Sequence, residues 1–423
     1  MGRLARFRLG KSEQDVDRAI RCVVAYAYEH TAHYRRLFDD AGLRPDRIEG
    51  ARDLPRVPVT TRDAIGEEPW RSILSDRAVE SRCRRALTSG STGTLLAVHL
   101  SAPEAYYRRL LLLCAFYKNL GLRLPLRVAE VGPRDERPPD DLVQRVGLIH
   151  VAHVRLEGSV AEAVGLLRRF RPHILTGAPS CLELLAEEWR DEGCGDLRLI
   201  VARGEVLGRE ARERLASAFR RRVVDYYGCE EVGNVAWECP DDDGRLHVNT
   251  DACVLEVVSG AGRPVPRGTE GAVVVTSLFS YTMPFVRYAL GDRTHFLEEA
   301  GARCRCGSAL PAIAAPSGRD EDFLVLRDGR RVSPRTLDNV VGHALYARTA
   351  CAERAVRYRI VQEEVDVVRV EAVIPEDAAE DLQVALDVAC RGLSADLRCR
   401  LYPVVGFPED GTGKFRRVVS RIS

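Results

Sequence analysis

The sequence is poor in lysine. Arginine and lysine together number 63 in 423 residues, but only Lys11, Lys118 and Lys414 are lysine. We interpret this bias as compositional drift toward arginine, which makes each remaining lysine informative. Lys414 lies in a Gly-Thr-Gly-Lys stretch, whose glycines predict a mobile tip. A compact ammonium on a long stem suits a carboxylate or an α-phosphate, and a solvated basic tail is the alternative.

Long apolar runs are also missing. The longest, residues 110–117, fits a buried helix and is too short to span a bilayer. The first residues lack the apolar stretch of a signal peptide. Thirteen cysteines, an odd number in a chain of this length, do not indicate a disulfide framework, so we expect the cytoplasm. The 63 basic residues are mixed with 62 acidic ones, and this pattern excludes a basic stripe for nucleic acid.

The length predicts two or three domains. Strands alternate with helices over 127–227, which predicts a parallel sheet with helices on its faces. Short strands over 245–297, one of them at 285–288, predict a β-rich subdomain. Beyond residue 318 the pattern is β-α-β-β-α-β. The predicted fold is therefore α/β, with a large N-terminal domain (1–317) of mostly parallel sheets and a β-rich subdomain, and a small mobile α+β C-terminal domain (318–423).

Residues 88–94 read Thr-Ser-Gly-Ser-Thr-Gly-Thr and carry the strongest chemical signal. Glycines let consecutive backbone N–H groups point to one side, and hydroxyls add donors, so such a loop can wrap a polyanion. The lysine of a Walker P-loop is missing, which excludes that motif. A flexible polar linker is the alternative. Apolar residues on both sides favour a loop held between two buried segments.

Three further motifs carry groups suited to a nucleotide. Residues 226–231, Tyr-Tyr-Gly-Cys-Glu-Glu, follow the last parallel strand, where an aromatic ring can stack on a base and a carboxylate can hold Mg²⁺. Residues 288–292, Tyr-Ala-Leu-Gly-Asp, end a predicted strand with a carboxylate that can accept from ribose hydroxyls. Residues 318–322, Gly-Arg-Asp-Glu-Asp, place an arginine on the domain boundary, where it can reach phosphate or ribose. Ordinary turns and solvated acids are the alternative for each.

Four donors suggest a metal site. Cys239 and His247 flank a turn, and Cys304 and Cys306 form a Cys-x-Cys knuckle. Together they make a Cys₃His set, which is typical of structural zinc. The spacing is not that of a standard zinc finger. Cys253 is an alternative ligand, and unpaired thiols with a surface histidine are the alternative to any site.

In this order the motifs resemble the adenylate-forming superfamily of acyl-CoA synthetases, adenylation domains and luciferases. The shared order is the hydroxyl-glycine loop, Tyr-Gly-x-x-Glu, Tyr-x-x-Gly-Asp, Gly-Arg-x-x-Asp and Gly-x-Gly-Lys. The closest branch is similar to phenylacetate-CoA ligases and coenzyme F390 synthetase-like proteins. Residues 57–62, 177–180 and 283–288 fit that branch, and some of its members also carry zinc through cysteines and a histidine.

The resemblance implies roles for individual residues. The β- and γ-phosphates of ATP would be held by the hydroxyl-glycine loop, whose residues are Thr88, Ser89, Gly90, Ser91, Thr92, Gly93 and Thr94. The adenine would lie along Gly204 and Glu205 beside Tyr227 and Gly228. Glu231 would bind Mg²⁺, and Asp292 with Arg319 would take the ribose. Lys414 would contact the carboxylate and the α-phosphate, and Glu321 would be the hinge of the C-terminal domain.

The resemblance also implies the reaction. A carboxylic acid, small and aromatic in the branch, would be activated by ATP as acyl-AMP with release of pyrophosphate, then passed to CoA. Passage to a carrier protein or a nitrogen nucleophile stays open, as does an inactive nucleotide-binding, zinc-stabilised module. Glu230 favours this last alternative, because it stands where the family usually has Ser or Thr, and a second carboxylate beside phosphates is costly unless it turns away or meets a cation. Relatives are commonly dimers, so a homodimer is possible.

Overall fold

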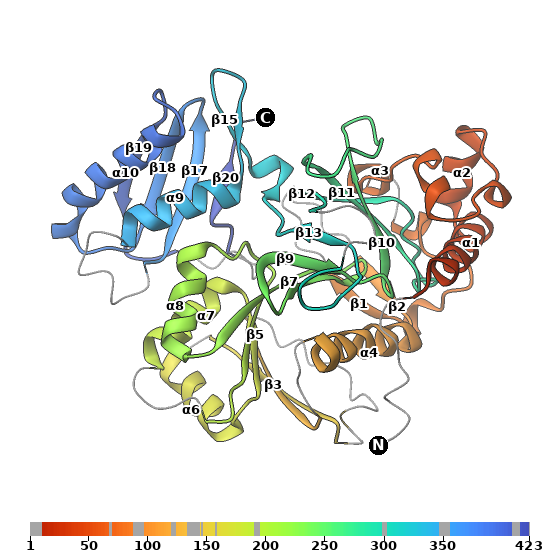
Figure 1. Ribbon diagram of the computed structural model, residues 1–423, viewed down its shortest axis with the longest axis horizontal. Coiled ribbons are helices and arrows are strands. Elements are labelled where there is room, and N and C mark those ends of the chain that lie inside the picture. Colours follow the sequence, from red (N-terminus) through yellow and green to blue (C-terminus); the bar gives the residue numbers. More distant parts are fainter. Residues whose placement is uncertain are drawn as a thin grey trace. The chain divides into compact units, whose positions relative to one another are not determined.

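The chain forms two compact units, each built from two separate stretches of sequence (Figure 1). The first unit joins Met1–Arg123 to Tyr226–Ala315, and the second joins Leu124–Asp225 to Pro316–Ser423. The division at residue 317 therefore stays a prediction. The computed structural model describes residues 11–66, 70–87, 97–119, 124–132, 144, 147–156, 159–189, 195–297, 303–346, 356–407 and 415–422.

Two capped helices begin the described part of the first unit. The Ser12 hydroxyl accepts from the Asp15 N–H at the start of α1 (Glu13–His30), and the Thr31 hydroxyl caps α2 (Ala32–Asp40) in the same way. Ile20, Val23, Val24 and Ala27 recur at helical spacing and are buried, so one apolar face of α1 enters the core. That core includes residues 278 and 286, far along the chain. The other short elements before α4 (Ala102–Asn119) are η2 (Pro45–Arg47), η3 (Ala51–Arg56), α3 (Arg62–Gly66), η4 (Trp70–Ser72), η5 (Glu80–Arg82), β1 (Arg84–Leu87) and β2 (Ala97–Leu100).

Antiparallel strands make the rest of the first unit. They are β7 (Arg222–Cys229), which belongs to this unit from Tyr226 on, β8 (Gly233–Cys239), β9 (Asp242–Val248), β10 (Cys253–Val258), β11 (Gly271–Ser277), β12 (Tyr288–Thr294) and β13 (Ala312–Ala314). Strand β8 pairs with β7 and β9, and β11 pairs with β10 and β12. The β-rich subdomain predicted over 245–297 is thus confirmed.

The strand predicted at 285–288 is wrong, because β12 begins only at Tyr288. Arg287 has a left-handed backbone (φ 45°), which no regular strand accommodates. Its N–H donates to the Thr276 hydroxyl, and its buried guanidinium pairs with Glu256 at 3.0 Å. The segment is therefore shaped by an anchored arginine, which the alternation of apolar residues does not reveal.

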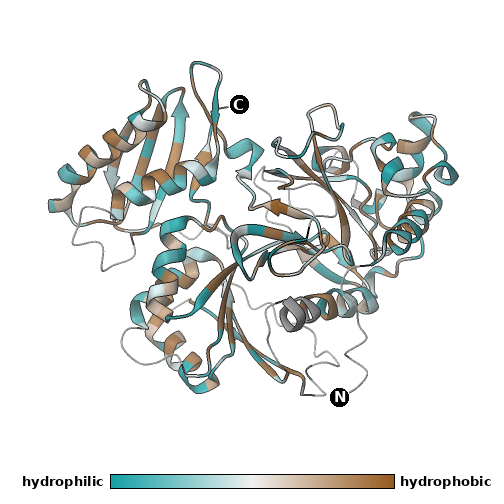
Figure 2. Cartoon of the chain, in the orientation of Figure 1, coloured by the Kyte–Doolittle hydropathy of each residue, from teal (hydrophilic) through white to brown (hydrophobic). Residues whose placement is uncertain are grey.

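The first half of the second unit has the predicted alternation of strands and helices. Its parallel strands lie in the order β6-β5-β3-β4, with α6 (Val160–Phe170), α7 (Pro179–Glu188) and α8 (Arg209–Phe219) along one face (Figure 1). The strands are β3 (Leu126–Val131), β4 (Ile149–Val154), β5 (Ile174–Gly177) and β6 (Leu199–Arg203). Apolar side chains of the helices and the strands share one core. Figure 2 colours the hydrophobic residues along these helices and strands brown. The carboxyl ends of β5 and β6 are followed within three residues by Ser180 and Glu205, which belong to the candidate site.

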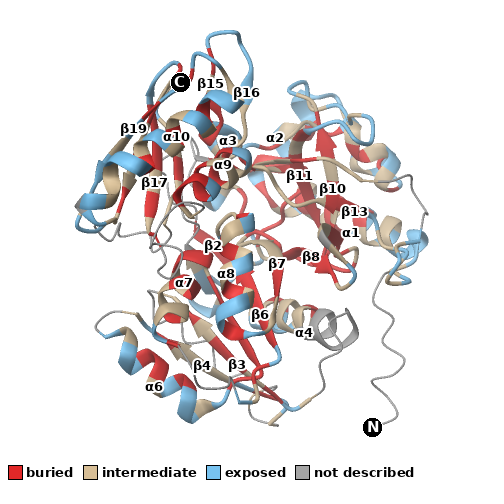
Figure 3. Ribbon diagram, turned by 60° about the vertical axis from the view of Figure 1, so that its left-hand side comes forward, coloured by how far each residue is buried: buried red, intermediate tan, exposed pale blue. Residues whose placement is uncertain are grey.

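The second half of this unit confirms the β-α-β-β-α-β pattern and adds three strands. Four strands lie in the order β19-β18-β17-β20 (Figure 1). Two helices pack on them over a separate core, whose buried residues are red in Figure 3. The elements are β14 (Gly318–Arg319), η6 (Asp320–Asp322), β15 (Leu324–Val325), β16 (Arg331–Val332), α9 (Pro334–Tyr346), β17 (Tyr358–Glu364), β18 (Val367–Ala372), η8 (Glu376–Ala378), α10 (Ala379–Leu393), β19 (Arg398–Pro403) and β20 (Val418–Ser420). Strands β14, β16 and β20 are additional to the predicted pattern. Among the described residues of the whole chain, no helix combines the length and apolarity needed to cross a bilayer.

Candidate functional site

The hydroxyl-glycine loop connects two strands that pair with each other. Leu87 at the end of β1 lies opposite Ala97 at the start of β2 in an antiparallel ladder. All four residues of β2 are buried, whereas Ala86 on β1 is only half-buried. Of the two flanking segments predicted to be buried, the one after the loop is therefore fully buried and the one before it is not. Residues 88–94 themselves lie outside the described part of the chain.

Two of the predicted nucleotide residues meet in the first unit. Tyr227 on β7 donates its hydroxyl to Oδ2 of Asp292 on β12 at 2.7 Å, although 65 residues separate them. Asp292 lies within β12 and not after it, which corrects the predicted end of that strand; Gly291 has a left-handed backbone (φ 82°) inside the strand. Gly228 is required at its position, because an added Cβ would lie 2.6 Å from the Gly233 carbonyl oxygen.

Glu231 is a buried carboxylate in the same unit. Its side chain is 7% exposed, and burial raises its pKa, with the charge of Glu230 adding to the effect. A carboxylate in this setting gains from a nearby cation, so its surroundings fit the predicted Mg²⁺ ligand. Glu230 itself meets a cation, since Arg108 on α4 pairs with its carboxylate at 3.3 Å and donates to its carbonyl oxygen at 2.8 Å.

Glu205 follows β6 in the second unit and uses its carboxylate inside the protein. Gly204 before it is left-handed (φ 85°). Oε2 of Glu205 accepts from the Ser180 N–H at 3.1 Å, and Oε1 accepts from the Ser180 hydroxyl at 2.8 Å and from the Phe415 N–H at 3.1 Å. Burial raises the pKa of Glu205. The adenine role inferred for Gly204 and Glu205 stays a prediction. Because the Glu205 carboxylate already accepts three hydrogen bonds, we expect the main chain of these residues to contact the adenine.

Arg319 and Glu321 lie together at the start of the second unit's C-terminal stretch. Arg319 is on β14, and its guanidinium is 3.8 Å from the Glu321 carboxylate on η6. Arg416 also pairs with Glu321 at 3.9 Å and with the neighbouring Asp322. The ribose and hinge roles of Arg319 and Glu321 stay predictions. Lys414 lies outside the described residues.

The four predicted zinc ligands converge in the first unit. Their ligand atoms all lie within 4.8 Å of one another, with Sγ of Cys239 3.5 Å from Sγ of Cys304 and Sγ of Cys306 3.3 Å from Nε2 of His247. Two thiolates at about 2.3 Å from one tetrahedral zinc stand roughly 3.8 Å apart, so the group fits that ion. Cys253, the alternative ligand, is buried in the apolar core and is not in this group.

Three residues of the site region were not predicted from the sequence. Arg108 gave no signal, because one arginine among many on a helix looks like a solvated side chain. Glu183 and Asp338 are the others, and both are buried acids that pair with Arg417. Their apolar neighbours at helical spacing hinted at buried positions, but the partner lies more than 70 residues away in each case.

Comparison with known proteins gives, first, a match to a family model. Residues 145–281 match the family model of the AMP-binding enzyme. At 137 of 423 residues, the match covers the segment from before β4 to the end of β11.

The individual relatives extend this match. The chain is 29% identical to the phenylacetate-coenzyme A ligase of Thermus thermophilus over 337 residues, covering 75% of this chain and 72% of the relative. It is 27% identical to the phenylacetate-coenzyme A ligase of Escherichia coli, covering 76% and 74%. A crystal structure of 2-hydroxyisobutyryl-CoA ligase in the postadenylation state shares the fold, with a TM-score of 0.78 at 21% identity, over 97% of this chain and 90% of that chain. The resemblance to the adenylate-forming superfamily is thereby confirmed.

Proposed function

We propose that this protein is an AMP-forming acid–thiol ligase that activates a carboxylic acid with ATP and transfers the acyl group to CoA. The observation that carries the proposal is the contact of Tyr227 with Asp292, which joins the two motifs assigned to adenine and ribose. The relatives named phenylacetate-coenzyme A ligase support an aryl acid and CoA as the substrates.

The proposed reaction has two steps. A carboxylate oxygen of the acid attacks the α-phosphorus of ATP, the bond to pyrophosphate breaks, and acyl-AMP forms. The CoA thiolate then attacks the acyl carbon and AMP leaves. Charge neutralisation dominates the first step, because the attack creates no covalent bond to the protein. Lys414 and the donors of residues 88–94 would supply it, and Glu231 would hold the Mg²⁺ that shields the phosphates.

The remaining proposals concern what surrounds this chemistry. Zinc in the group Cys239, His247, Cys304 and Cys306 would be structural, since four protein ligands leave no open position for a substrate. A homodimer and a cytoplasmic location stay predictions. The same holds for the small aromatic character of the acid.

A pyrophosphate-exchange screen over aryl, amino-aryl and short aliphatic acids tests the proposal. We expect ATP–pyrophosphate exchange with an aryl acid and AMP release that depends on CoA. Exchange without any effect of CoA would assign another acceptor. Nucleotide binding with no exchange across the whole panel would instead indicate an inactive module and overturn the proposed function.

A further inference from the structure

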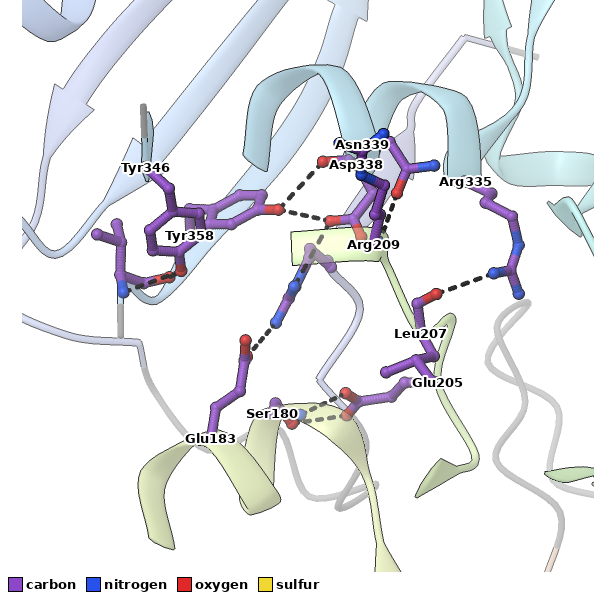
Figure 4. A network of polar contacts seen from close by, with 12 residues as sticks. Ser180, Glu183, Glu205, Leu207, Arg209, Arg335, Asp338, Asn339, Tyr346 and Tyr358 are labelled. Atoms are coloured by element: carbon purple, nitrogen blue, oxygen red, sulfur yellow. Dashed lines mark hydrogen bonds and ion pairs between the residues drawn. The ribbon is translucent and has the colours of Figure 1, made fainter. Parts of the chain in front are cut away.

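A polar network in the second unit joins the C-terminal stretch to the helices that follow β5 and β6 (Figure 4). Its first part is centred on Glu205. Ser180, at the N-terminus of α7, holds this carboxylate through its N–H and its hydroxyl, and the Phe415 N–H completes the set at 3.1 Å. Three hydrogen bonds therefore converge on Glu205, and one of them ties a main-chain position of the C-terminal stretch to the residue that follows β6.

The second part of the network is a buried charge cluster. Arg417 donates to Oε2 of Glu183 on α7 at 2.7 Å and lies 3.6 Å from Oδ1 of Asp338 on α9. Arg214 on α8 pairs with the other oxygen of Glu183, and the Tyr358 hydroxyl donates to Asp338 at 2.7 Å. Glu183 and Asp338 are 5% and 3% exposed, so these charges depend on one another. Removing one member of such a cluster leaves an uncompensated buried charge.

Further contacts bring α9 against the loop that precedes α8. Arg335 donates to the Leu207 carbonyl oxygen at 2.8 Å, and the Arg209 N–H donates to Oδ1 of Asn339 at 2.8 Å. Gly208 permits this approach, because an added Cβ would lie 2.2 Å from Oδ2 of Asp338.

This contact is polar, whereas the two cores on either side of it are apolar and separate. One core uses residues between 129 and 223, the other uses residues between 324 and 418, and within the described chain neither includes a residue of the other. An interface built of charges and hydrogen bonds, with little shared apolar surface, suits docking that can be released.

We propose that Glu205 and Glu183 are positioning residues for the first half-reaction, docking residues 415–417 for acyl-AMP formation and releasing them before thioester formation. The inference rests on the proposed function, because it assigns Lys414 to the adenylation step. Phe415 follows Lys414 directly in the sequence, so the anchor on the Phe415 N–H acts on the residue next to the proposed adenylation lysine.

The test separates the two half-reactions in Glu183→Gln, Glu205→Gln and the control Glu162→Gln, which changes an exposed acid on α6. Pyrophosphate exchange measures acyl-AMP formation, and thioester formation from supplied acyl-AMP and CoA measures the second step. We expect exchange to fall about 10- to 100-fold in the first two variants, the range set by a lost hydrogen bond to a charged group. The second step should stay within about twofold of wild type, as should both steps in the control.

Amide hydrogen exchange gives a readout that does not depend on activity. The segment 415–417 should exchange faster in Glu205→Gln than in wild type, while β17, β18 and β20 keep their protection because they belong to one sheet. Equal losses in both half-reactions, or an unchanged rate of amide hydrogen exchange in this segment, would overturn the inference and leave the proposed function standing. A wild type without pyrophosphate exchange would overturn the proposed function, and this inference with it.

Discussion

Glu230 stands where adenylate-forming enzymes usually have a hydroxyl residue, and Arg108 explains how the fold accommodates it. The guanidinium binds the Glu230 carboxylate and the carbonyl oxygens of Cys229 and Glu230. The Glu230 carboxylate therefore meets a cation, which is one of the two conditions under which a second acid beside phosphates would be tolerated. The same arginine explains Gly233, because a Cβ there would lie 2.4 Å from Nε of Arg108.

We expect Arg108→Gln to lower kcat/KM for Mg·ATP about tenfold, because Glu230 then repels the phosphates without compensation. Adding Glu230→Gln should recover most of this loss, and Glu230→Ser alone should leave activity near wild type. Steady-state kinetics of the double-mutant cycle measure the coupling. Strictly additive effects of the two substitutions would contradict this account, and Arg18→Gln, on the exposed side of α1, is the control.

His33 predicts a pH dependence of stability. It is 7% exposed beside Thr60, and burial lowers its pKa to about 4. Above pH 6.5 the imidazole is neutral in the folded and the unfolded chain, so His33 does not change the free energy of unfolding. Between pH 6.5 and 4 the unfolded chain takes up a proton that the folded chain does not, so stability falls as the pH falls.

The size of this effect follows from the shift, and His33→Gln isolates it. The shift of about 2.5 units corresponds to about 3 kcal/mol at full effect. Between pH 7 and pH 4.5 the wild type should therefore lose about 2 kcal/mol more unfolding free energy than the variant, measured by urea denaturation. Parallel curves for the two proteins would rule out His33 as the source.

The four ligand residues of the zinc group could be predicted from the sequence, but the way in which they converge in space could not. Cys239 and His247 lie on the paired strands β8 and β9, with Trp237 opposite His247, so the ladder fixes two ligands. Cys304 and Cys306 come from a tight turn in which the Gly307 N–H donates to the Cys304 carbonyl oxygen at 2.8 Å. The sequence supplied the four residue types, and the pairing of distant strands supplied their convergence.

We expect one zinc ion per chain in the purified protein, measured by elemental analysis. Cys306→Ala should lose it and unfold at a lower temperature, because a three-ligand group holds the turn weakly. A loss of about 2 kcal/mol corresponds to a Tm lower by roughly 4–8 °C for a unit of this size. Cys22→Ala, at an exposed cysteine on α1, should change neither value. Equal zinc contents in wild type and Cys306→Ala would disprove the site.

Elements with strong periodicity were predicted well, and those shaped by single side chains were not. Helices α6 and α8 lie within the alternation predicted over 127–227, because their buried apolar residues recur at helical spacing. The strand expected at 285–288 failed because Arg287 reaches Glu256 and the Val57 carbonyl oxygen. The resemblance named Glu205 as a site residue, but its partner Phe415 is 210 residues away, which no local pattern encodes.

The two half-reactions make different demands on the molecule, and Lys414 belongs to only one of them in our proposal. Lys414→Ala should abolish acyl-AMP formation, because the ammonium neutralises charge at the α-phosphate, and should spare thioester formation from supplied acyl-AMP. Single-turnover assays of each step measure this, with Lys118→Ala as the matched control. Equal loss of both steps would contradict a lysine that serves adenylation alone.

The interleaved make-up of the two units has a consequence for synthesis on the ribosome. Residues 124–225 are translated long before their partners 316–423, and 1–123 wait for 226–315. The nascent polypeptide therefore carries each early half without its complement, with buried acids such as Glu183 lacking Arg417 until the final residues emerge. Residues 129–223 can bury a core of their own at an early stage, whereas the helices of the first unit share a core with residues 278 and 286 and stay incomplete until those emerge. Chaperones that shield unfinished chains would therefore meet the first unit for most of its translation time.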